Sequence, residues 1–491
     1  MADTDMFDFS GKRVAILSAL PKTGEQGGAE RLYQGMLKGF SDIGCQADLI
    51  NVAADESTFE QILLNYDYCK NLDLSGYDFV VSTKVPTYSV QHPNHVLLLV
   101  HTVRVFDDMF SEVVPSPSRE HFLQRAKIHE LDFQAIRKIK ARFAIGHEVA
   151  KRLYRWRGLE AEVIHPPLGF NEFRQGGNGE YFFLPGRLHS WKRVDLIIKA
   201  IRQSSLPLRF LIAGTGEAED DLKRLADGDT RIEFLGRIGD EQLVELYANA
   251  LAVPFVPARE DYGYITLEAF ASGKPVVTCA DSGEPTYFVR NYETGLVAQP
   301  NPESLCSALE WMFLNPMYAA EMGRSGLRVV AEMSWKKTAE RLAVAAFSQQ
   351  SVISPKSRVV VLDMQPIDPA VGGGRLRLLG LYHQLGESIE CRYVGSYDWP
   401  GERYRAHELS SGLFEIDVPL TDAHHAAAVA LSGKASGKGV IDIAFSQQGM
   451  LSPEYVETAK RELGAADVVI FSHPWVYPLV RDSIRPTQVV I

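Results

Sequence analysis

The amino-acid sequence predicts an α/β protein that consists of successive parallel sheets. Short apolar runs alternate with helical patterns along most of the chain, as expected for strands joined by crossover helices. This rhythm starts afresh twice, after the Gly- and Asn-rich stretch at 175–179 and after the polar stretch at 348–357. Since a domain usually holds about 100–200 residues, the length of 491 residues also predicts three domains.

Composition and charge restrict the class of protein. The sequence is 46% apolar and 23% charged, which excludes a mainly disordered or coiled-coil chain. Its net charge is −11, so we expect no nucleic acid among its partners, because nonspecific binding to phosphates needs a surplus of cations. The five cysteines are widely spaced, as in a cytoplasmic protein with free thiols, and no stretch reaches the roughly 18 apolar residues of a membrane span.

The first unit begins with the strand RVAILSA at 13–19, a Gly-rich loop at 24–28 and a helix at 29–39. Gly27 and Gly28 could let backbone amides approach an anion at the helix N-terminus, although a tight turn would need the same residues. Further apolar runs predict strands at 47–52, 78–82, 96–100 and 141–145.

The second unit contains the short apolar strands YFFLPG, LRFLIAG, IEFLG, ALAVPF and KPVVTC. Arg187 and Lys192 lie between the first of these strands and a helix that opens near Val194. Two cations at the carboxyl end of a strand could clamp a phosphate, each charge-assisted bond contributing about 1.5–3 kcal/mol. A solvated loop with surface cations is the alternative.

Two glutamates, Glu260 and Glu268, lie eight positions apart in the segment PAREDYGYITLEAFASGKPVV at 257–277. Gly263 stands in the loop between them, and Glu268 stands at the start of a helix that ends at Gly273. This spacing allows both carboxylates to face one crevice and accept hydrogen bonds from sugar hydroxyls. A bare pair of acids is more often a surface feature, but the apolar helix and strand that follow favour a site.

At this point the sequence resembles the retaining glycosyltransferases of the GT-B fold, in particular glycosyltransferase family 4. The 257–277 segment is similar to that family's E-x7-E motif, GGAER at 27–31 to its glycine loop, VHTVR at 100–104 to its His-Thr-Pro-x-Arg signature, and GRLHSWKRVD at 186–195 to its Gly-Arg…Lys signature. The resemblance covers residues 10–345 and implies two Rossmann-like domains that form one active site.

The resemblance also implies roles for single residues on the phosphate side of a nucleotide-sugar donor. The residues that match Arg187 and Lys192 hold the diphosphate, and Gly27 and Gly28 would place amides near its distal phosphate. Fixed cations and amides stabilise the negative charge that builds on the departing phosphate.

On the sugar side, the counterpart of Glu268 accepts the ribose hydroxyls and that of Glu260 contacts the transferred sugar. The counterpart of His101 lies near the reacting face of that sugar, and Gly263 belongs to the donor-binding loop. Catalytic roles are thus expected for His101, Glu260, Arg187 and Lys192.

The function that follows is a metal-independent, retaining hexosyltransferase that uses a UDP- or GDP-linked sugar and no other cofactor. Its partner would be a glycan or lipid-linked acceptor, in the synthesis of a bacterial surface polysaccharide such as O-antigen or capsule. The alternatives are an inactive sugar-nucleotide-binding or scaffolding module, and a phosphorylase or epimerase of the same fold.

Some residues depart from the family pattern or bear on a metal. Glu284 stands where the family has a glycine and Tyr287 where it has a glutamate, which puts the donor contacts of that loop in doubt. The Asp-x-Asp sequences at 3–5 and 227–229 are interpreted as surface turns. We interpret three separate histidines as structural or surface residues and not as ligands: His129, His147 and His165.

Eight basic residues gather at 137–157. With Arg104, the residues Arg152 and Arg155 are candidates for contact with the acceptor or with an anionic membrane at the inner face of the cytoplasmic membrane. Solvated helix faces are the alternative interpretation.

The third unit, 351–491, repeats the layout of the first: a strand RVVVLDMQP, glycines at 372–374 and a helical stretch. Strands are expected at 440–444, at 467–471 and in the final QVVI. We interpret this unit as a partial N-terminal domain of a second, similar glycosyltransferase in a longer chain, with a natural docking domain as the alternative. The predicted domains are therefore 1–172 on the acceptor side, 173–350 on the donor side with a crossover helix, and 351–491.

Overall fold

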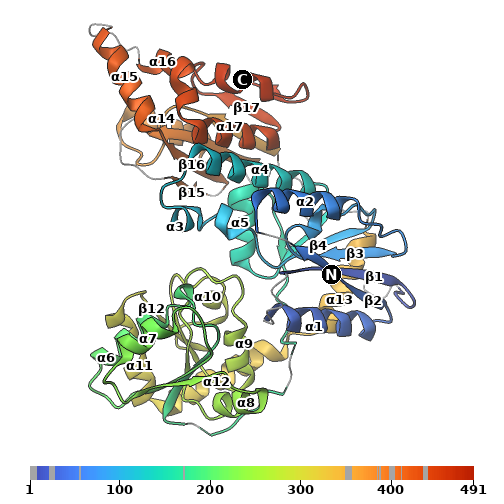
Figure 1. Cartoon of the computed structure of the whole chain (residues 1–491), viewed down its shortest axis with the longest axis vertical. Coiled ribbons are helices and arrows are strands. Elements are labelled where there is room, and N and C mark those ends of the chain that lie inside the picture. The colour runs from blue at the N-terminus through green and yellow to red at the C-terminus, as the bar shows by residue number, and fades with distance from the viewer. Residues whose placement is uncertain are drawn as a thin grey trace. The chain divides into compact units, whose positions relative to one another are not determined.

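The computed structural model describes residues 8–21, 28–54, 57–169, 172–177, 179–348, 357–383, 385, 389–397, 404–410, 412–434 and 441–491. The chain forms two compact units (Figure 1). Unit 1 consists of Met1–His101, Ala141–Lys151 and Ala161–Gln349, and unit 2 consists of Thr102–Lys140, Arg152–Glu160 and Gln350–Ile491. Unit 2 thus takes two segments from the predicted first domain.

Unit 1 begins with a six-stranded parallel sheet in the order β2-β1-β3-β4-β5-β6. Its strands are β1 (Arg13–Pro21), β2 (Gln46–Ala54), β3 (Phe79–Ser82), β4 (His95–Leu99), β5 (Ala141–Ala144) and β6 (Glu162–Val163), and its helices are α1 (Gly28–Asp42), α2 (Phe59–Lys70) and the start of α5 (His147–Arg157). The strands at 13–19, 47–52, 78–82, 96–100 and 141–145 are confirmed to within two residues at each end. β3 is buried at every position, as a strand covered on both faces must be.

The second sheet of unit 1 has two halves, β9-β8-β7 and β10-β11-β12, which a parallel bridge between Phe182 and Ala252 joins. Its strands are β7 (Tyr181–Pro185), β8 (Arg209–Ala213), β9 (Ile232–Gly236), β10 (Val253–Pro254), β11 (Val276–Cys279) and β12 (Gly295–Ala298). Its helices are α6 (Val194–Gln203), α7 (Glu219–Ala226), α8 (Asp240–Ala248), α9 (Tyr264–Ala271), α10 (Pro285–Phe288), α11 (Pro302–Leu314) and α12 (Pro316–Ala331). All its pairings are parallel, so the loops that follow its strands meet at one edge.

Helix α13 (Trp335–Phe347) returns to the first sheet of unit 1. The ring of Phe347 lies 5.5 Å from that of Phe79 in β3, and the Trp335 indole donates to the carbonyl of Leu168. A Cβ added to Gly35 in α1 would lie 2.0 Å from the Trp335 ring, so only glycine lets the two helices come this close.

Unit 2 is built around a third sheet, in the order β15-β16-β14-β13-β17-β18. Its strands are β13 (Ser357–Leu362), β14 (Ile389–Tyr397), β15 (Arg405–Ser410), β16 (Leu413–Pro419), β17 (Val468–Phe471) and β18 (Val489–Val490). Its helices are α3 (Phe110–Val113), α4 (Arg119–Ile136), the end of α5, α14 (Gly372–Tyr382), α15 (Asp422–Lys434), α16 (Ile441–Gln448), α17 (Pro453–Ala465) and α18 (Tyr477–Val480). Only the β15–β16 pairing is antiparallel among the described strands.

Two predictions for unit 2 need correction. The strand expected at 440–444 is wrong for residues 441–444, which form the first turn of α16, where Ala444 is buried; residue 440 lies outside the described residues. A short apolar run is compatible with either structure. Three strands, β14 to β16, were not predicted. Buried charged residues interrupt the apolar pattern in β14 (Arg392) and in β16 (Glu415 and Asp417), and the sequence of β15, RAHELS, is mostly polar.

All five cysteines are buried free thiols. Among the described residues, no helix has the length and apolar character that crossing a membrane requires.

Candidate functional site

A cation and an acid face each other at the carboxyl edge of the second sheet of unit 1. The Lys192 ammonium lies 2.7 Å from Oε2 of Glu260, and both side chains are partly exposed, at 28% and 22%. Lys192 also lies over the ring of Phe255. The predicted phosphate-clamp lysine and the first predicted glutamate are therefore brought together, whereas Arg187 is exposed on the same loop.

Arg193, next to Lys192, fixes the loop that carries this pair. Its φ of 50° lies in the left-handed region, and it precedes the first turn of α6. Its guanidinium donates to the carbonyls of Val256 and Pro257, both at 2.7 Å, and to the carboxylate of Asp281. The loops after β7, β10 and β11 are thereby tied together behind Lys192 and Glu260.

Gly263 supplies the turn between the two glutamates. It has a φ of 81°, and an added Cβ would lie 2.9 Å from Phe255 and 2.9 Å from Pro285. Both the backbone conformation and the space require glycine here. α9 starts directly afterwards, which places Glu268 in its second turn, slightly later than the sequence suggested.

Glu268 is buried, and two residues that sequence reasoning overlooked contact it. The Tyr247 hydroxyl donates to Oε2 at 2.7 Å, and the guanidinium of Arg31 lies 3.5 Å from Oε1. Burial raises the pKa of Glu268, while the bond from Tyr247 and the charge of Arg31 act against this rise. Arg31 belongs to the GGAER segment, so the sequence offered a signal for it.

The remaining predicted site residues lie on the first sheet of unit 1. His101 is half-buried two residues after β4, and Gly28 is the first residue of α1, whereas Gly27 lies outside the described residues. The Asp-x-Asp at 3–5 also lies outside them, and in the one at 227–229 Asp229 forms an ion pair with Arg231.

The interpretation of His147 and His165 as separate residues is wrong. Both donate to Oε1 of Glu284, His147 through Nδ1 at 3.0 Å and His165 through Nε2 at 2.7 Å. Glu284 and the two histidines are of types that hold zinc, but these distances match direct N–H···O bonds. His129 is not isolated either, since it is fully buried against Asp107.

A second group of possible metal ligands, His407, Glu415 and Asp417, lies in unit 2. Burial and then the charge of Asp417 raise the pKa of Glu415 to about 8. Arg405 neutralises part of this cluster through Asp417.

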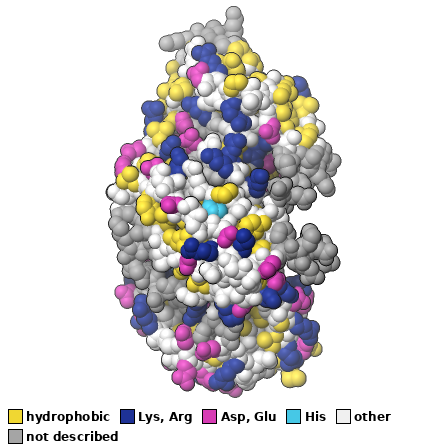
Figure 2. Space-filling view, turned by 90° about the vertical axis from the view of Figure 1, so that its right-hand side faces the viewer, with side chains coloured by type: hydrophobic (Ala, Val, Ile, Leu, Met, Phe, Trp, Pro, Cys, Tyr) yellow, Lys and Arg dark blue, Asp and Glu magenta, His cyan; other side chains and the backbone are white. Residues whose placement is uncertain are grey.

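A basic helix face that binds an acceptor or a membrane must expose its cations to solvent. The predicted basic residues do not all meet this requirement. Arg152 is only 3% exposed and pairs with Asp108, which also binds Arg104. Arg155 is exposed. The face seen in Figure 2 shows basic side chains interspersed with acidic and apolar ones. Arg152 therefore cannot contact an outside anion in this structure, because its charge is used inside unit 2.

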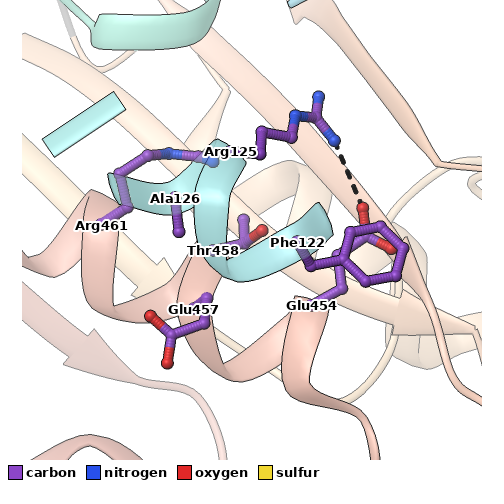
Figure 3. A pocket seen from close by; sticks show the side chains of 7 residues that line it. All are labelled: Phe122, Arg125, Ala126, Glu454, Glu457, Thr458 and Arg461. Atoms are coloured by element: carbon purple, nitrogen blue, oxygen red, sulfur yellow. Dashed lines mark hydrogen bonds and ion pairs between the residues drawn. The ribbon is translucent and has the colours of Figure 1, made fainter. Parts of the chain in front are cut away.

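A small cavity lies in unit 2 between α4 and α17 (Figure 3). It holds about 10 Å³, which is room for a single water molecule. Two of the residues that line it, Arg125 and Glu454, form an ion pair with each other. A cavity of this size cannot hold a nucleotide sugar.

Comparison with known proteins places a family match on the sheet that carries Lys192, Glu260 and Glu268. Residues 170–329 match the family described as Glycosyl transferases group 1. D-rhamnosyltransferase WbpZ of Pseudomonas aeruginosa is 30% identical over 148 residues, 30% of this chain and 39% of WbpZ. D-inositol 3-phosphate glycosyltransferase of Rhodococcus erythropolis is 33% identical over 171 residues, 32% of this chain and 38% of the enzyme. The chain thus spans less than two thirds of each of these relatives.

Solved structures confirm the predicted fold class. Sucrose-phosphate synthase from Thermosynechococcus elongatus matches with a TM-score of 0.55 and 16% identity, over 68% of this chain and 97% of the synthase. WaaG, a glycosyltransferase involved in lipopolysaccharide biosynthesis, matches with a TM-score of 0.51 and 15% identity, over 68% of this chain and 100% of WaaG. The fold is α/β with parallel, Rossmann-like sheets in the GT-B arrangement.

Proposed function

We propose that this protein is a hexosyltransferase that transfers a sugar from a nucleotide diphosphate to a glycan or lipid-linked acceptor. The observation that carries the proposal is the ion pair Lys192–Glu260, which lies in the same family-matching segment as the buried Glu268. Ligands of open parallel sheets bind outside the carboxyl ends of the strands, where these side chains lie.

The chemistry follows from the charges. Lys192 and Arg187 would bind the diphosphate, and Glu268 would accept hydrogen bonds from the ribose hydroxyls. The acceptor hydroxyl would attack the anomeric carbon from the face that the phosphate leaves. The new bond forms as the carbon–phosphate oxygen bond breaks, the hydroxyl proton passes to the departing phosphate, and the configuration is retained. Lys192 stabilises the negative charge on the leaving group, so that the proposed reaction requires no metal ion.

Glu260 would serve two states of this site. Without a donor it holds the Lys192 ammonium at 2.7 Å, close to where the phosphates would bind. With a donor it would accept hydroxyls of the transferred sugar while Lys192 turns to the diphosphate. We further propose a place in bacterial surface polysaccharide synthesis, by analogy with WaaG, a glycosyltransferase of the same fold that is involved in lipopolysaccharide biosynthesis. We do not extend the proposal to a membrane contact, because Arg152 is buried.

The test is donor binding and turnover with a panel of UDP- and GDP-linked sugars. A donor at 100 times its Kd should stabilise the fold by about 2.7 kcal/mol, seen as a higher Tm. Lys192→Ala and Glu268→Ala should abolish turnover. Lys199→Ala is the matched control, because Lys199 is an exposed lysine of α6 that pairs with Asp195.

Unchanged transfer in either site variant would refute the assignment of the site. A product with inverted configuration would refute the retaining mechanism. Binding of donors without any turnover would favour the inactive sugar-nucleotide-binding module, and reaction of the sugar without transfer would favour a phosphorylase or epimerase.

A further inference from the structure

The carboxylate of Glu284 connects the two sheets of unit 1. Its side chain is fully buried at the start of α10, after the last strand residue Cys279 of β11. Its hydrogen-bond donors come from three residues that follow strands of the first sheet: His147 and Glu148 begin α5 after β5, and His165 follows β6. The bond from Glu148 N measures 2.8 Å.

These bonds keep the carboxylate ionised. Burial alone would raise the pKa of Glu284, but the bonds from His165, Glu148 and His147 outweigh it and lower the pKa. Removing the partners of a buried charge strongly lowers the stability of the fold. The contact between the two sheets therefore depends on these donor residues.

Rings on both sides hold the two imidazoles in place. The ring of His147 stacks on that of Tyr287, with 4.1 Å between the ring centres and an angle of 10° between the planes. The ammonium of Lys151 lies 5.3 Å from the centre of the same Tyr287 ring. His165 packs against Phe288 at 4.8 Å. Glu284 and Tyr287 both depart from the family pattern, and they contact the same histidine, His147.

The segment that carries Glu284 also fixes Glu260. The Glu260 N–H donates to the carbonyl of Ser282 at 2.9 Å, and the Glu284 N–H donates to the carbonyl of Glu260 at 3.0 Å. Between them Gly283 has a φ of 78°, and a Cβ there would lie 2.5 Å from Glu260 N. The residue with the buried carboxylate, Glu284, is therefore hydrogen-bonded directly to the backbone of Glu260, the proposed sugar-binding glutamate.

We propose that Glu284 is a positioning residue: held by His147 and His165, it sets the spacing of the two sheets of unit 1 and, through Ser282 to Glu284, the place of Glu260. The inference rests on the proposed function for its catalytic consequence. A displacement of about 1 Å at a reacting centre can lower a rate by about 100-fold.

The experiment compares Glu284→Gln with the control Glu293→Gln, which removes an exposed acid a few residues away. We expect Glu284→Gln to lower kcat about 10- to 100-fold while binding of UDP or GDP alone, which depends on Glu268, changes less than twofold. The double variant His147→Ala, Glu284→Gln should have the same kcat as Glu284→Gln alone, because both substitutions disrupt the same contact between the two side chains. An unchanged kcat would overturn the proposal, and so would a parallel loss of kcat and nucleotide binding, since that is the result of a merely structural role.

A second readout does not depend on transfer. Amide hydrogen exchange at 282–286 should be faster in Glu284→Gln than in the wild type or Glu293→Gln, and equal exchange would also overturn the proposal. If Lys192→Ala and Glu268→Ala leave donor use unchanged while this exchange still rises, the proposed function fails and the connection between the sheets stands.

Discussion

The first sheet of unit 1 and the sheet of unit 2 share four adjacent parallel strands, β2-β1-β3-β4 in unit 1 and β14-β13-β17-β18 in unit 2, but they place different residues at corresponding positions. In unit 1, Leu17 of β1 pairs with Ser82 of β3, and in unit 2, Leu362 of β13 pairs with Phe471 of β17. The residue after Leu17 is Ser18, which still belongs to β1, and the residue after Leu362 is Asp363, which directly follows β13.

Both residues are fully buried, yet they differ in kind, since Ser18 is a neutral residue and Asp363 is an acid. Ser18 forms a hydrogen bond with the neutral Asn51 of β2. Asp363 accepts from the Tyr393 hydroxyl at 2.7 Å and from Nδ1 of His473 at 2.9 Å. Corresponding positions in the two sheets thus have apolar neighbours in the strands but different polar partners. The strands follow from the apolar pattern, whereas the hydrogen bonds at these positions depend on the individual residues.

Buried ion pairs extend this contrast in unit 2. Arg392 of β14 is fully buried, donates to Glu462 of α17 at 2.5 Å and also donates to the carbonyls of Tyr154 and Arg155. It thus joins the C-terminal sheet to the end of α5 within unit 2. Removing one partner of such a set leaves the other charge buried without compensation.

The largest effect is therefore expected from Arg392→Ala. It should lower the free energy of unfolding of unit 2 by about 3–5 kcal/mol and leave the response of unit 1 to a nucleotide sugar unchanged. Chemical denaturation followed by tryptophan fluorescence, with and without donor, measures both. Arg481→Ala, at an exposed arginine, is the control and should cost less than about 0.5 kcal/mol. Loss of the donor response together with unit 2 would show that the two units unfold as one.

The pH dependence should be the next largest effect. Burial tends to raise the pKa of Glu462, but the charge of Arg392 outweighs it and lowers the pKa to about 2. Because the folded pKa is depressed, the stabilisation is present above the ordinary glutamate range and is lost as the pH falls from about 4.5 toward 2. Urea denaturation between pH 5 and pH 2.5 should show a loss of about 2–3 kcal/mol, and Glu462→Gln should flatten this profile. An equally steep profile in the variant would assign the loss to other acids.

The smallest effects compare the two matched positions directly. Asp363→Asn should cost about 1–3 kcal/mol, because it removes the charge that Tyr393 and His473 solvate, whereas Ser18→Ala should cost about 1 kcal/mol. Thermal denaturation of the two variants beside the wild type measures the difference. Equal costs would mean that the charge at Asp363 adds nothing beyond a hydrogen bond.

Much of the fold could be predicted from the sequence, because parallel strands covered on both faces are continuous apolar runs. The strands at 13–19 and 78–82 are of this kind, and so is the strand at 467–471. The predictions failed where burial and polarity disagree, as in β16, whose Glu415 and Asp417 are buried, and at residues 441–444, which form a helix.

The candidate site shows the same division. Glu260, Glu268, Lys192 and Gly263 could be named from their spacing and from the family resemblance, because each stands in a short segment whose pattern can be recognised locally. Their roles remain predictions. Arg31 and Tyr247 were not assigned, because contact with Glu268 arises between elements distant in sequence.

The α/β class, the three successive α/β units and the segment with the predicted donor-site residues could be inferred from the sequence alone, because they depend on patterns local in the chain. Only the tertiary structure decided that Glu284 is bound by His147 and His165, and that Arg152 is buried against Asp108. The physical reason is that a charged residue's role is set by which groups surround it after folding, and no local pattern records whether Glu284 will face water, a ligand or two imidazoles.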